Sequence, residues 1–447
     1  MKIKKVCLVM LAGGSIFFGQ AVTAKEEAVA GDMGKLDFNL KAMHILGDAG
    51  NGYDPSEGSA YMIKLKYLTP SWKDLKVGVG FYNVGDLFNL TDFDAAGDSD
   101  KRLARGMFVT DDGQEKSHMG EFYLNYKHEK FVVNGGRQLY KTPLTTIAYS
   151  TMPNFHTAFG VSTSAIPNLK LSLDQITQMS FGARAATDYG LIGEATRTAG
   201  ASVSPVALEQ AEFLSVSKAA IGVDEDTNGI TVLGVSYDLL KNTKVSAWNY
   251  YADDISNTLY LDATTGFPVN KFKLGISAQF LTQSENGSLI EDMGIRGFTD
   301  GIDYNLFGLK AVFKGKGWLA FAAYNKSSGD TGMFNSWGGD PAYTSTIFSR
   351  NAYRENVSAY KIGVKYNFMK NLFAMLSYAN YGQSDTLGYG GAGTAATTDA
   401  DEIDLVLVYK PIKDLMLKLF HAERTSEYDG VVDRTQSHTR LIASYKF

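Results

Sequence analysis

The chain has 447 residues, of which 45% are hydrophobic, 12% aromatic and 20% charged, and its formal net charge is −5. This acidic balance argues against nucleic acid as a partner, because proteins that bind nucleic acid carry an excess of cations. The only cysteine is Cys7, so no disulfide can form within the chain. The mixture of apolar and polar residues suits both soluble β-sandwiches and barrels whose strands face lipid on one side, so composition leaves both classes open.

The N-terminal segment has the layout of a cleaved secretory signal. Residues 1–5 carry three lysines, Val6 to Phe18 is mostly apolar, and Val22-Thr23-Ala24 offers small residues before charged ones. We expect cleavage after Ala24, with Ala30 as the second choice, so that residues 1–24 are removed. A membrane anchor is the alternative, but the apolar run is shorter than the roughly 20 residues that a spanning helix needs. Cleavage takes Cys7 and three positive charges away, which changes the net charge from −5 to −8.

Three segments further along the chain alternate polar and apolar side chains. Lys35 to Ala42, Lys271 to Phe280 and His438 to Phe447 each place their apolar residues on one face of a strand. Such a strand suits a wall between lipid and water, and strands are stable in lipid only when a closed barrel pairs all their backbone groups. A span of about 10 residues, tilted by about 40°, crosses the apolar band of an outer membrane. The pattern predicts an all-β transmembrane antiparallel β-barrel in residues 25–447.

Counting by this rule gives about eighteen strands, and the pattern allows sixteen to twenty. The least regular strands are 157–165 and 255–263, and an extra hairpin around Phe213 to Ile221 is an alternative in the stretch from Ser180 to Asn228. A barrel of this size is too wide for side chains to fill, so its lumen holds water. The expected strands are 35–46, 59–67, 75–84, 119–127, 130–137, 157–165, 169–179, 229–238, 244–253, 255–263, 271–282, 302–313, 318–325, 358–368, 372–382, 401–410, 415–424 and 438–447.

The connections between these strands alternate between short and long. Tyr237 to Asn242, Tyr366 to Asn371 and Tyr409 to Asp414 share the form Tyr-x-x-x-Lys-[Asn/Asp], which predicts one type of short hairpin with its tyrosine at the membrane interface. Short turns on one rim and long loops on the other are typical of outer-membrane barrels, and both chain termini then lie on the short-turn side. We therefore expect a bacterial outer membrane with its lipid bilayer and lipopolysaccharide. We also expect the barrel assembly machinery to recognise the last strand, which ends in Phe447.

The middle of the chain resembles a known family. Gly136-Arg137-Gln138, Thr142-Pro143-Leu144, Met152-Pro153-Asn154, Ala158-Phe159-Gly160 and Leu169-Lys170-Leu171 look like the region around the third loop of OprD-type porins, the outer-membrane carboxylate channels. These motifs lie within residues 135–179, and in outline the resemblance covers the whole chain. It implies an eighteen-stranded channel whose third loop folds into the lumen, and a ladder of basic residues that guides small solutes bearing carboxylates.

The loop from Leu139 to Thr157 is the segment expected to fold inward. Apart from tyrosine, its ionisable groups are one lysine and one histidine, and a loop with so little charge can lie against a barrel wall without strong repulsion. An ordinary exposed loop is the alternative. The candidate residues of the constriction are Lys141, Pro143, Tyr149, Pro153 and His156.

Eight basic residues are candidates for the ladder. Seven lie on the polar face of a predicted strand, where facing lipid would cost each about 2–4 kcal/mol near the midplane, so we expect them to face the lumen. Arg137 is included only because it lies in the Gly-Arg-Gln motif of the resemblance. Aligned cations between low-dielectric walls raise the local concentration of anions, which is the physical basis of anion preference. The candidates are Lys41, Lys64, Arg137, Lys273, Lys310, Lys361, Lys418 and Arg440; Lys66, Lys365 and Lys446 lie nearer the short-turn rim, where we expect them to meet solvent.

Other chemistry is not favoured by the sequence. Asp224-Glu225-Asp226 lacks the glycine and distal glutamate of a calcium loop, and the six histidines show no catalytic or metal spacing, so we expect no catalytic residue, metal or cofactor. We expect a passive porin for small hydrophilic solutes, with a preference for carboxylates such as amino acids and small organic acids. A general-diffusion porin is the alternative, followed by a barrel enzyme and a structural or adhesive barrel. A monomer and a homotrimer are both compatible, because apolar side chains that face lipid or a neighbouring copy look alike.

Overall fold

The computed structural model describes residues 33–48, 50, 55–88, 91, 107–109, 113–146, 151–183, 211–222, 224–293, 298, 301–334, 337–347, 351–383, 397–428 and 432–447. The predicted signal peptide, residues 1–24, lies outside these residues. The strands are β1 (Lys35–Asp48), β2 (Ser56–Leu68), β3 (Leu75–Asp86), β4 (Lys116–His128), β5 (Phe131–Gln138), β6 (Phe155–Thr163), β7 (Leu169–Ser180), β8 (Leu214–Ser215), β9 (Ile230–Leu240), β10 (Thr243–Ala252), β11 (Ser256–Val269), β12 (Phe272–Glu285), β13 (Asp303–Lys314), β14 (Trp318–Ser328), β15 (Ser358–Met369), β16 (Leu372–Tyr381), β17 (Thr397–Ile412), β18 (Leu415–Tyr428) and β19 (Arg434–Lys446). The described parts of the long connections contain α3 (Val216–Ile221), α4 (Leu289–Asp292) and η4 (Asn351–Tyr353).

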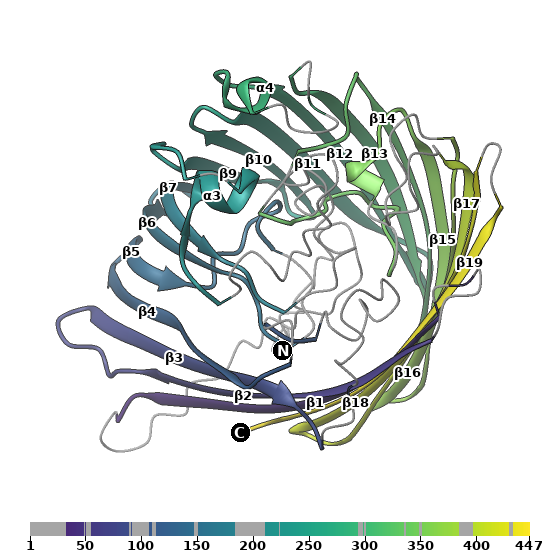
Figure 1. The fold of residues 1–447 in the computed structure, drawn as a ribbon, viewed down its shortest axis with the longest axis horizontal. Helices are drawn as coiled ribbons and strands as arrows, with labels where there is room; N and C mark the ends of the chain where they lie inside the picture. The colour runs from purple at the N-terminus through teal and green to yellow at the C-terminus, as the bar shows by residue number, and fades with distance from the viewer. Residues whose placement is uncertain are drawn as a thin grey trace.

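The strands form one antiparallel sheet that closes on itself (Figure 1). Each long strand pairs with the long strands before and after it, and β1 pairs with β19, where Asn39 lies opposite Lys446 and Asp48 opposite Ser437. The two-residue strand β8 pairs with the end of β7, while the rest of β7 pairs with β9. The described residues therefore form an eighteen-stranded barrel with one extra strand, which confirms the predicted fold.

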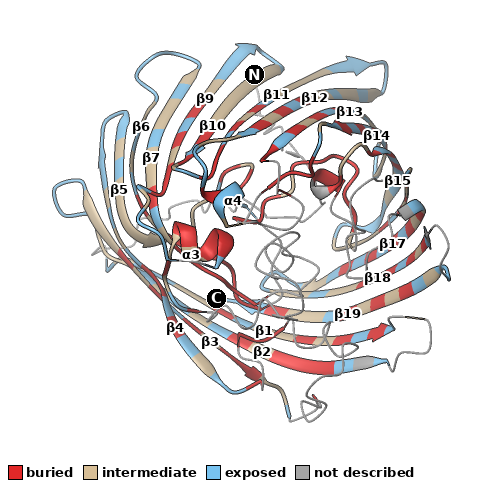
Figure 2. Ribbon diagram, turned by 45° about the horizontal axis from the view of Figure 1, so that its top comes forward, coloured by how far each residue is buried: buried red, intermediate tan, exposed pale blue. Residues whose placement is uncertain are grey.

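Side-chain alternation separates an outer wall from an inner wall. In β19, Leu441 is 46% and Tyr445 is 37% exposed, whereas Arg440 and Ser444, on the other face, are buried. The exposed positions carry large apolar residues, as a wall in contact with lipid requires. Figure 2 shows the same alternation along many strands, and it shows buried segments such as α3 inside the ring of strands. The polar face that the sequence predicts is thus the face that lines the lumen.

Both ends of the sheet lie at the short-turn rim. Lys35 of β1 lies opposite Leu68, at the end of β2 where a short turn begins. The backbone N–H of Lys446 donates to the carbonyl of Asp414, in the turn between β17 and β18, at 3.0 Å. The first and last strands therefore begin and end at the same rim, as the pattern of turns predicts.

Several strands are longer than the alternation predicts. β17 covers 397–412 instead of 401–410, and β11 continues to Val269 instead of ending at residue 263. Backbone pairing continues beyond the apolar band, where side chains need not alternate. In β11 the pairing also includes Pro268, and because proline is rare in strands, the sequence does not predict this end of the strand. β6 starts at Phe155, two residues before the predicted start, so the third loop ends at residue 154.

The predicted alternative of a hairpin around Phe213 to Ile221 is wrong. These residues form β8 and the helix α3, because the Ser215 side chain accepts a hydrogen bond from the N–H of Lys218 and caps the helix. Gly222, with φ of +81°, ends the helix in the left-handed conformation. None of the helices in the described ranges is long and apolar enough to span a membrane.

A large apolar cluster lies inside the barrel, between the inner wall of β7 to β13 and the long connections. The wall contributes Tyr250 and Tyr260, the third loop contributes Leu144, helix α3 contributes Ala219, and the loop between β14 and β15 contributes Trp337. Full burial of a large apolar side chain stabilises a fold by about 1.5–3 kcal/mol. The long connections on this side are therefore held in the lumen by a hydrophobic core of their own.

Candidate functional site

The described parts of the third loop, residues 139–146 and 151–154, fold into the lumen, as predicted. The backbone N–H of Leu144 donates to the hydroxyl of Tyr250, on the inner face of β10, at 3.3 Å. Further along the loop, Met152 packs in a cluster with Met62 of β2 and Tyr82 of β3. The loop therefore reaches from the wall near the start of the chain to strands in the middle of the chain, and it narrows the water path between them.

A second connection folds inward and meets the third loop. This is the β14–β15 loop, whose described residues are 329–334, 337–347 and 351–357. The hydroxyl of Tyr343 donates to Oδ2 of Asp262 on β11 at 2.9 Å, and burial raises the pKa of Tyr343, so its proton stays on the hydroxyl. The N–H of Gly339 donates to the carbonyl of Leu144 at 2.8 Å. The two loops thus form a joint constriction, of which the sequence predicted only one half.

The predicted constriction residues differ in their surroundings. Lys141 is exposed, Pro143 is half-buried and Pro153 is buried, while Tyr149 lies outside the described residues. The pKa of Lys141 is lowered, first by the protein atoms that crowd its amine and then by the positive charge of Lys64. The carboxylate of Glu121 acts on this amine in the opposite direction, so Lys141 lies near an acid as well as near other cations.

His156 is a residue of β6 and not of the loop in which the sequence placed it. Its ring is 1% exposed and packs edge-on against Tyr140, with 6.0 Å between the ring centroids. Neither ring nitrogen has a hydrogen-bond partner among the described residues. The position of His156 is thus determined by packing at the base of the third loop, and its ring does not face the open lumen.

Three ladder candidates lie close together on neighbouring strands, and we call them the basic wall: Lys41 of β1, Lys418 of β18 and Arg440 of β19. The amine of Lys418 and the guanidinium of Arg440 lie 5.1 and 5.2 Å from the ring centroid of Phe420. Lys41 interacts electrostatically with both cations. Nε of Arg440 donates to Nε2 of His438 at 2.7 Å. Like charges gathered at a low-dielectric surface attract anions strongly, so the basic wall is an anion-attracting stretch of the lumen.

Lys64 and Arg137 have partners of other kinds. The amine of Lys64 lies 2.6 Å from Oδ2 of Asp37, so an acid offsets its charge. The guanidinium of Arg137 lies 4.2 Å from the ring centroid of Phe213, which packs against the cluster that contains Met152. This cation–π contact orients Arg137 toward the base of the third loop.

Lys310 and Lys273 lie on the opposite side of the barrel from the basic wall. The amine of Lys310 lies 5.6 Å from the ring of Tyr343 and 5.8 Å from the ring of Phe321, so it faces the β14–β15 loop. Lys273 is near the short-turn end of β12, directly opposite Lys314 of β13. These two candidates therefore do not continue the basic wall.

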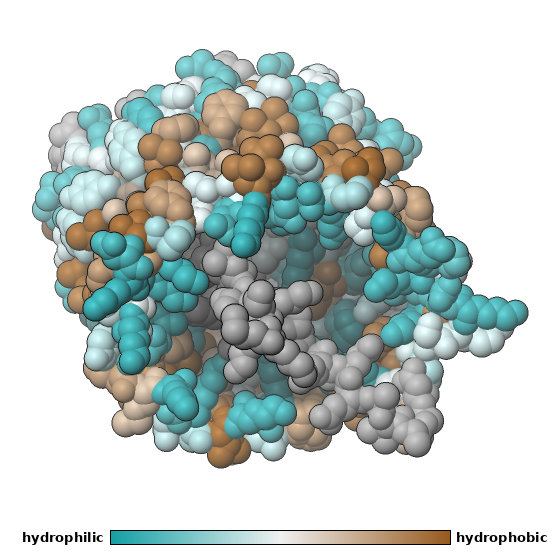
Figure 3. Space-filling model, turned by 180° about the vertical axis from the view of Figure 1, so that it is seen from behind, coloured by the Kyte–Doolittle hydropathy of each residue, from teal (hydrophilic) through white to brown (hydrophobic). Residues whose placement is uncertain are grey.

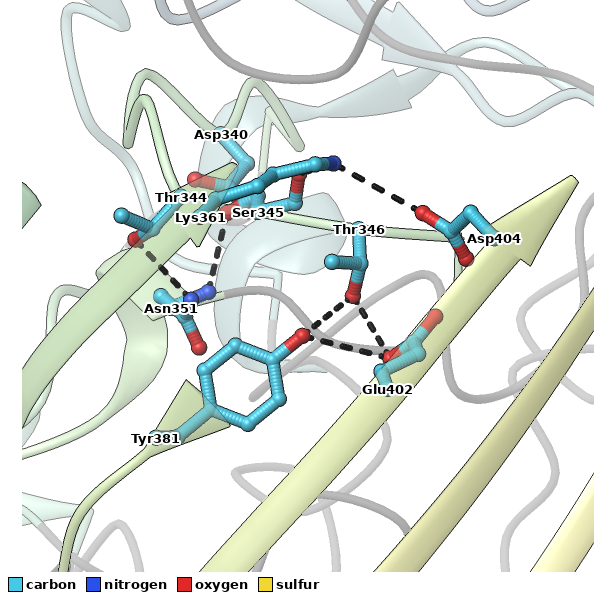
Figure 4. Close-up of polar contacts among 9 residues, drawn as sticks. All are labelled: Asp340, Thr344, Ser345, Thr346, Asn351, Lys361, Tyr381, Glu402 and Asp404. Carbon is cyan, nitrogen blue, oxygen red and sulfur yellow. Dashed lines mark hydrogen bonds and ion pairs between the residues drawn. The ribbon is translucent and has the colours of Figure 1, made fainter. Parts of the chain in front are cut away.

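Lys361 takes part in a buried polar network (Figure 4). Its side chain is about 5% exposed, its amine donates to the carbonyl of Ser345 at 2.8 Å, and the same amine lies 3.6 Å from Oδ2 of Asp404 on β17. Ser345 belongs to the β14–β15 loop. The lysine therefore joins this loop to the barrel wall, and its charge is offset by a buried acid.

Further contacts in Figure 4 fasten the same loop. The hydroxyl of Thr346 donates to Oε2 of Glu402 at 2.6 Å, and the hydroxyl of Tyr381 donates to the same oxygen at 3.3 Å. Within the loop, the side-chain amide of Asn351 donates to Thr344 at 3.0 Å. The two bonds to the carboxylate of Glu402 are charge-assisted. Together with Lys361 they hold the β14–β15 loop against β15 to β17, while Tyr343 holds it against β11.

Replacing Lys361 by methionine is expected to destabilise the folded barrel by about 3–5 kcal/mol, because Asp404 then stays buried without its cation. The free energy of unfolding in urea, measured with the barrel in detergent, gives the value. The double variant Lys361→Met, Asp404→Asn removes the uncompensated charge and should recover most of the loss. A double variant that is as unstable as the single one would contradict the assignment.

Sequence reasoning missed the acids of the lumen. Glu402 and Asp404 lie on the inner face of β17, and Glu121 of β4 accepts hydrogen bonds from Lys66 and Tyr82. Lys66 is thus paired and does not simply meet solvent. The alternation of side chains that predicts which lysines face the lumen also places Glu402 and Asp404 on the inner face of their strand. The ladder was predicted without these counter-charges.

The outer wall of the barrel, its inner wall and the opening of its lumen together define a class of protein. Figure 3 shows a hollow opening bordered by many hydrophilic side chains, with patches of hydrophobic ones around it. The exposed large apolar residues of the strands form the outer wall. Within the described ranges, no group of three or more His, Cys, Asp and Glu residues could hold a metal ion. A closed barrel with an apolar outer wall and a polar lumen narrowed by loops is an outer-membrane porin.

The comparisons with known proteins specify the family. The description "outer membrane porin, OprD family" matches residues 76–447, so the chain belongs to the OprD family and its place is the bacterial outer membrane. No curated protein matches the sequence. Among solved structures, Pseudomonas aeruginosa OpdK with vanillate is 15% identical, with a TM-score of 0.71 over 93% of this chain and 100% of that one. P. aeruginosa OccK8 (OprE) is 15% identical, with a TM-score of 0.70 over 94% and 99%. Acinetobacter baumannii OccAB4 is 14% identical, with a TM-score of 0.69 over 92% and 98%.

Proposed function

We propose that this porin lets small hydrophilic solutes diffuse passively across the outer membrane, with a preference for solutes that carry a carboxylate. The observation that carries the proposal is the basic wall, in which Lys41, Lys418 and Arg440 gather on neighbouring strands of a lumen that two loops narrow. A narrowed path brings each solute close to these cations. The cations then favour anionic groups by their field, without any covalent step.

A similar structure supports the same class of solute. The crystal structure of OpdK contains vanillate, which is an aromatic carboxylate. In this chain the cations of Lys418 and Arg440 both lie close to the ring of Phe420, which is itself buried in the inner wall. The two cations are therefore held together at one place, where the carboxylate of a solute can be attracted.

Two ion pairs in the lumen favour a general-diffusion porin as the second candidate. Asp37 offsets the charge of Lys64, and Asp404 offsets that of Lys361, so the ladder holds fewer uncompensated cations than the count of basic residues indicates. With weak net charge, size alone would decide passage. We infer from the family and the fold that the protein is a channel and not an enzyme.

Several further expectations accompany the proposal. We propose that residues 1–24 are removed as a signal peptide and that the barrel assembly machinery recognises the last strand. Phe447, at the end of that strand, pairs with the backbone of Phe38 on β1 at 3.0 and 3.1 Å, beside the seam of the barrel. The apolar outer wall contacts lipid, and both a monomer and a homotrimer fit this surface.

Single-channel recording of the purified protein in a planar bilayer tests the proposal. In a KCl gradient we expect a reversal potential of the sign that anion preference gives, and we expect vanillate or acetate to interrupt the open current. Large steps without ion preference, which carboxylates leave unchanged, would favour general diffusion. An absence of conductance from a folded barrel would overturn the assignment as a channel with an open lumen.

A further inference from the structure

Aromatic residues and lysines recur together at the short-turn rim. Five short turns follow the form aromatic-x-x-x-Lys, in which the aromatic residue lies near the end of a strand and the lysine lies in the turn. The turn between β2 and β3 has the same pair with two residues inserted. We call these six pairs the aromatic–lysine belt: Tyr67 with Lys73, Tyr126 with Lys130, Tyr237 with Lys241, Phe267 with Lys271, Tyr366 with Lys370 and Tyr409 with Lys413.

The aromatic rings of the belt lie on the outer wall. Each of the six aromatic residues is between 37% and 51% exposed. On β15, Tyr366 continues the outward row of Ile362 and Val364, which are exposed apolar residues. Aromatic rings at the rim of a membrane barrel lie at the boundary between the acyl chains and the headgroups. The belt therefore marks the level of the lipid headgroups.

The short turns carry more positive than negative charge. The eight short turns contain seven lysines, which are the six of the belt and Lys316, and three acids, which are Asp74, Glu129 and Asp414. Seven positive and three negative charges leave a net charge of +4. All seven lysines are exposed. Asp74 is in addition paired with His128, whose Nδ1 lies 2.8 Å from Oδ2 of the acid. The water side of this rim is therefore basic.

The outer wall of β17 and β18 is acidic at the opposite rim. On β17, Asp401 follows the outward row that contains Ile403, and on β18, Glu423 lies directly opposite Ile403. Asp401 accepts a hydrogen bond from the hydroxyl of Tyr378. The outer wall of these strands thus changes from basic at the short turns to acidic at the long loops. A negatively charged headgroup is attracted at the first rim and repelled at the second.

The spacing within a pair suits a phospholipid headgroup. Four residues of a strand tilted by about 40° rise by about 10 Å along the membrane normal. The lysine then lies on the water side of the ring, and its flexible stem allows the ammonium to reach back to the level of the phosphates. In the β2–β3 turn the amine of Lys73 lies 5.2 Å from the ring of Trp72, which is itself exposed. Cations and interfacial rings are therefore adjacent at this rim.

We propose that the aromatic–lysine belt binds anionic phospholipids of the periplasmic leaflet, with the acyl chains against the aromatic rings and the headgroup phosphate at the lysines. A lysine near a membrane surface favours an anionic lipid by about fivefold, which is its free-energy contribution expressed as a ratio. Phosphatidylglycerol has a net negative charge, whereas the cation of phosphatidylcholine offsets its own phosphate. The belt thus selects lipids by the charge of their headgroups.

Quenching of tryptophan fluorescence by brominated phospholipids tests this inference. Trp72 lies in the β2–β3 turn and Trp318 begins β14 opposite Tyr366, so both report on lipids at the short-turn rim. The protein is reconstituted in phosphatidylcholine vesicles that contain rising fractions of dibromo-phosphatidylglycerol or, in parallel, dibromo-phosphatidylcholine. We expect a binding constant for phosphatidylglycerol roughly fivefold that for phosphatidylcholine, and a smaller ratio at high salt. Equal binding constants would overturn the inference.

A matched pair of variants assigns the lipid preference to the lysines. The first variant should bring the two binding constants to about the same value, whereas the second, with arginine at the same seven positions, keeps the charge and should keep the preference. Circular dichroism shows whether both variants retain the barrel. A preference that survives in the first variant, or that is lost equally in both, would contradict the inference. The first variant carries Lys73→Gln, Lys130→Gln, Lys241→Gln, Lys271→Gln, Lys316→Gln, Lys370→Gln and Lys413→Gln.

Competition with inorganic phosphate separates a lipid site from a site for a free anion. Phosphate and chloride are added to the vesicles at equal ionic strength, and both should reduce the lipid preference to the same extent. A preference that phosphate abolishes and chloride does not would show a site for soluble phosphate and overturn the assignment to lipid. These measurements involve no solute of the pore, so their outcome does not depend on the proposed carboxylate preference.

Discussion

Replacing Lys418 and Arg440 together by glutamine is expected to lower the permeation of small carboxylates roughly tenfold, at the lower end of the enhancement that a charged cleft gives. Two of the three cations of the basic wall are then lost, and Lys41 remains as the third. Glutamine keeps most of the length of both side chains on the inner face. The reversal potential in a KCl gradient and the conductance in potassium acetate give the measurement.

The control for this variant is a pair of exposed lysines at the short turns. Lys241 and Lys271 are exposed and lie in or beside the short turns that follow β9 and β11. Their replacement by glutamine removes the same total charge, so a general effect of net charge would appear in both variants. If the control shifts the reversal potential as much as Lys418→Gln, Arg440→Gln does, the basic wall is not the source of anion preference.

Replacing Gly339 by valine is expected to raise the single-channel conductance roughly twofold, because the narrowest part of a pore sets its flux. A Cβ at this position would overlap the backbone of Leu144, so the hydrogen bond between the two loops cannot persist. The β14–β15 loop remains fastened to the wall through Lys361 and Glu402. The contact that gives way is therefore the one that joins the two loops of the constriction.

Gly266→Val is the matched control for the added side chain. A Cβ on Gly266 of β11 meets only the carbonyl of Leu274, at 3.7 Å, which is an ordinary van der Waals contact. The conductance of this variant should equal that of the unaltered protein. An unchanged conductance of Gly339→Val, in a barrel that is otherwise folded, would show that the contact between the loops does not limit the flux.

Alternation alone predicted most of the barrel, and the reason is physical. A residue that faces lipid must be apolar along the whole span, so segments such as His438 to Phe447 carry the pattern of their fold without any long-range information. The pattern fades where the strands leave the membrane, which is why the ends of β11 and β17 were missed. The family resemblance and the low charge of the third loop predicted that it folds inward, and the structure shows this inward fold.

The candidate site was less predictable, because the alternation along a strand gives the face on which a side chain lies and not the residues that it contacts. Lys64, Lys361 and Arg440 all lie on lumenal faces. Lys64 is paired with Asp37 and Lys361 with Asp404, whereas Arg440 belongs to the basic wall. These pairings join residues far apart in the chain. The contact between Gly339 and Leu144 is of the same kind, since no local pattern in either loop indicates the other.

The apolar cluster inside the barrel divides the inner wall into two regions in which mutations have different consequences. On β10 and β11, Tyr250 and Tyr260 are fully packed, so a polar or smaller residue there leaves a cavity or an unpaired group, as in the core of a soluble protein. On β18 and β19, Lys418 and Arg440 carry charges of the basic wall, so an exchange there changes the electric field in the lumen. New solute preferences can therefore arise on one side of the lumen, while the other side preserves the fold of the loops.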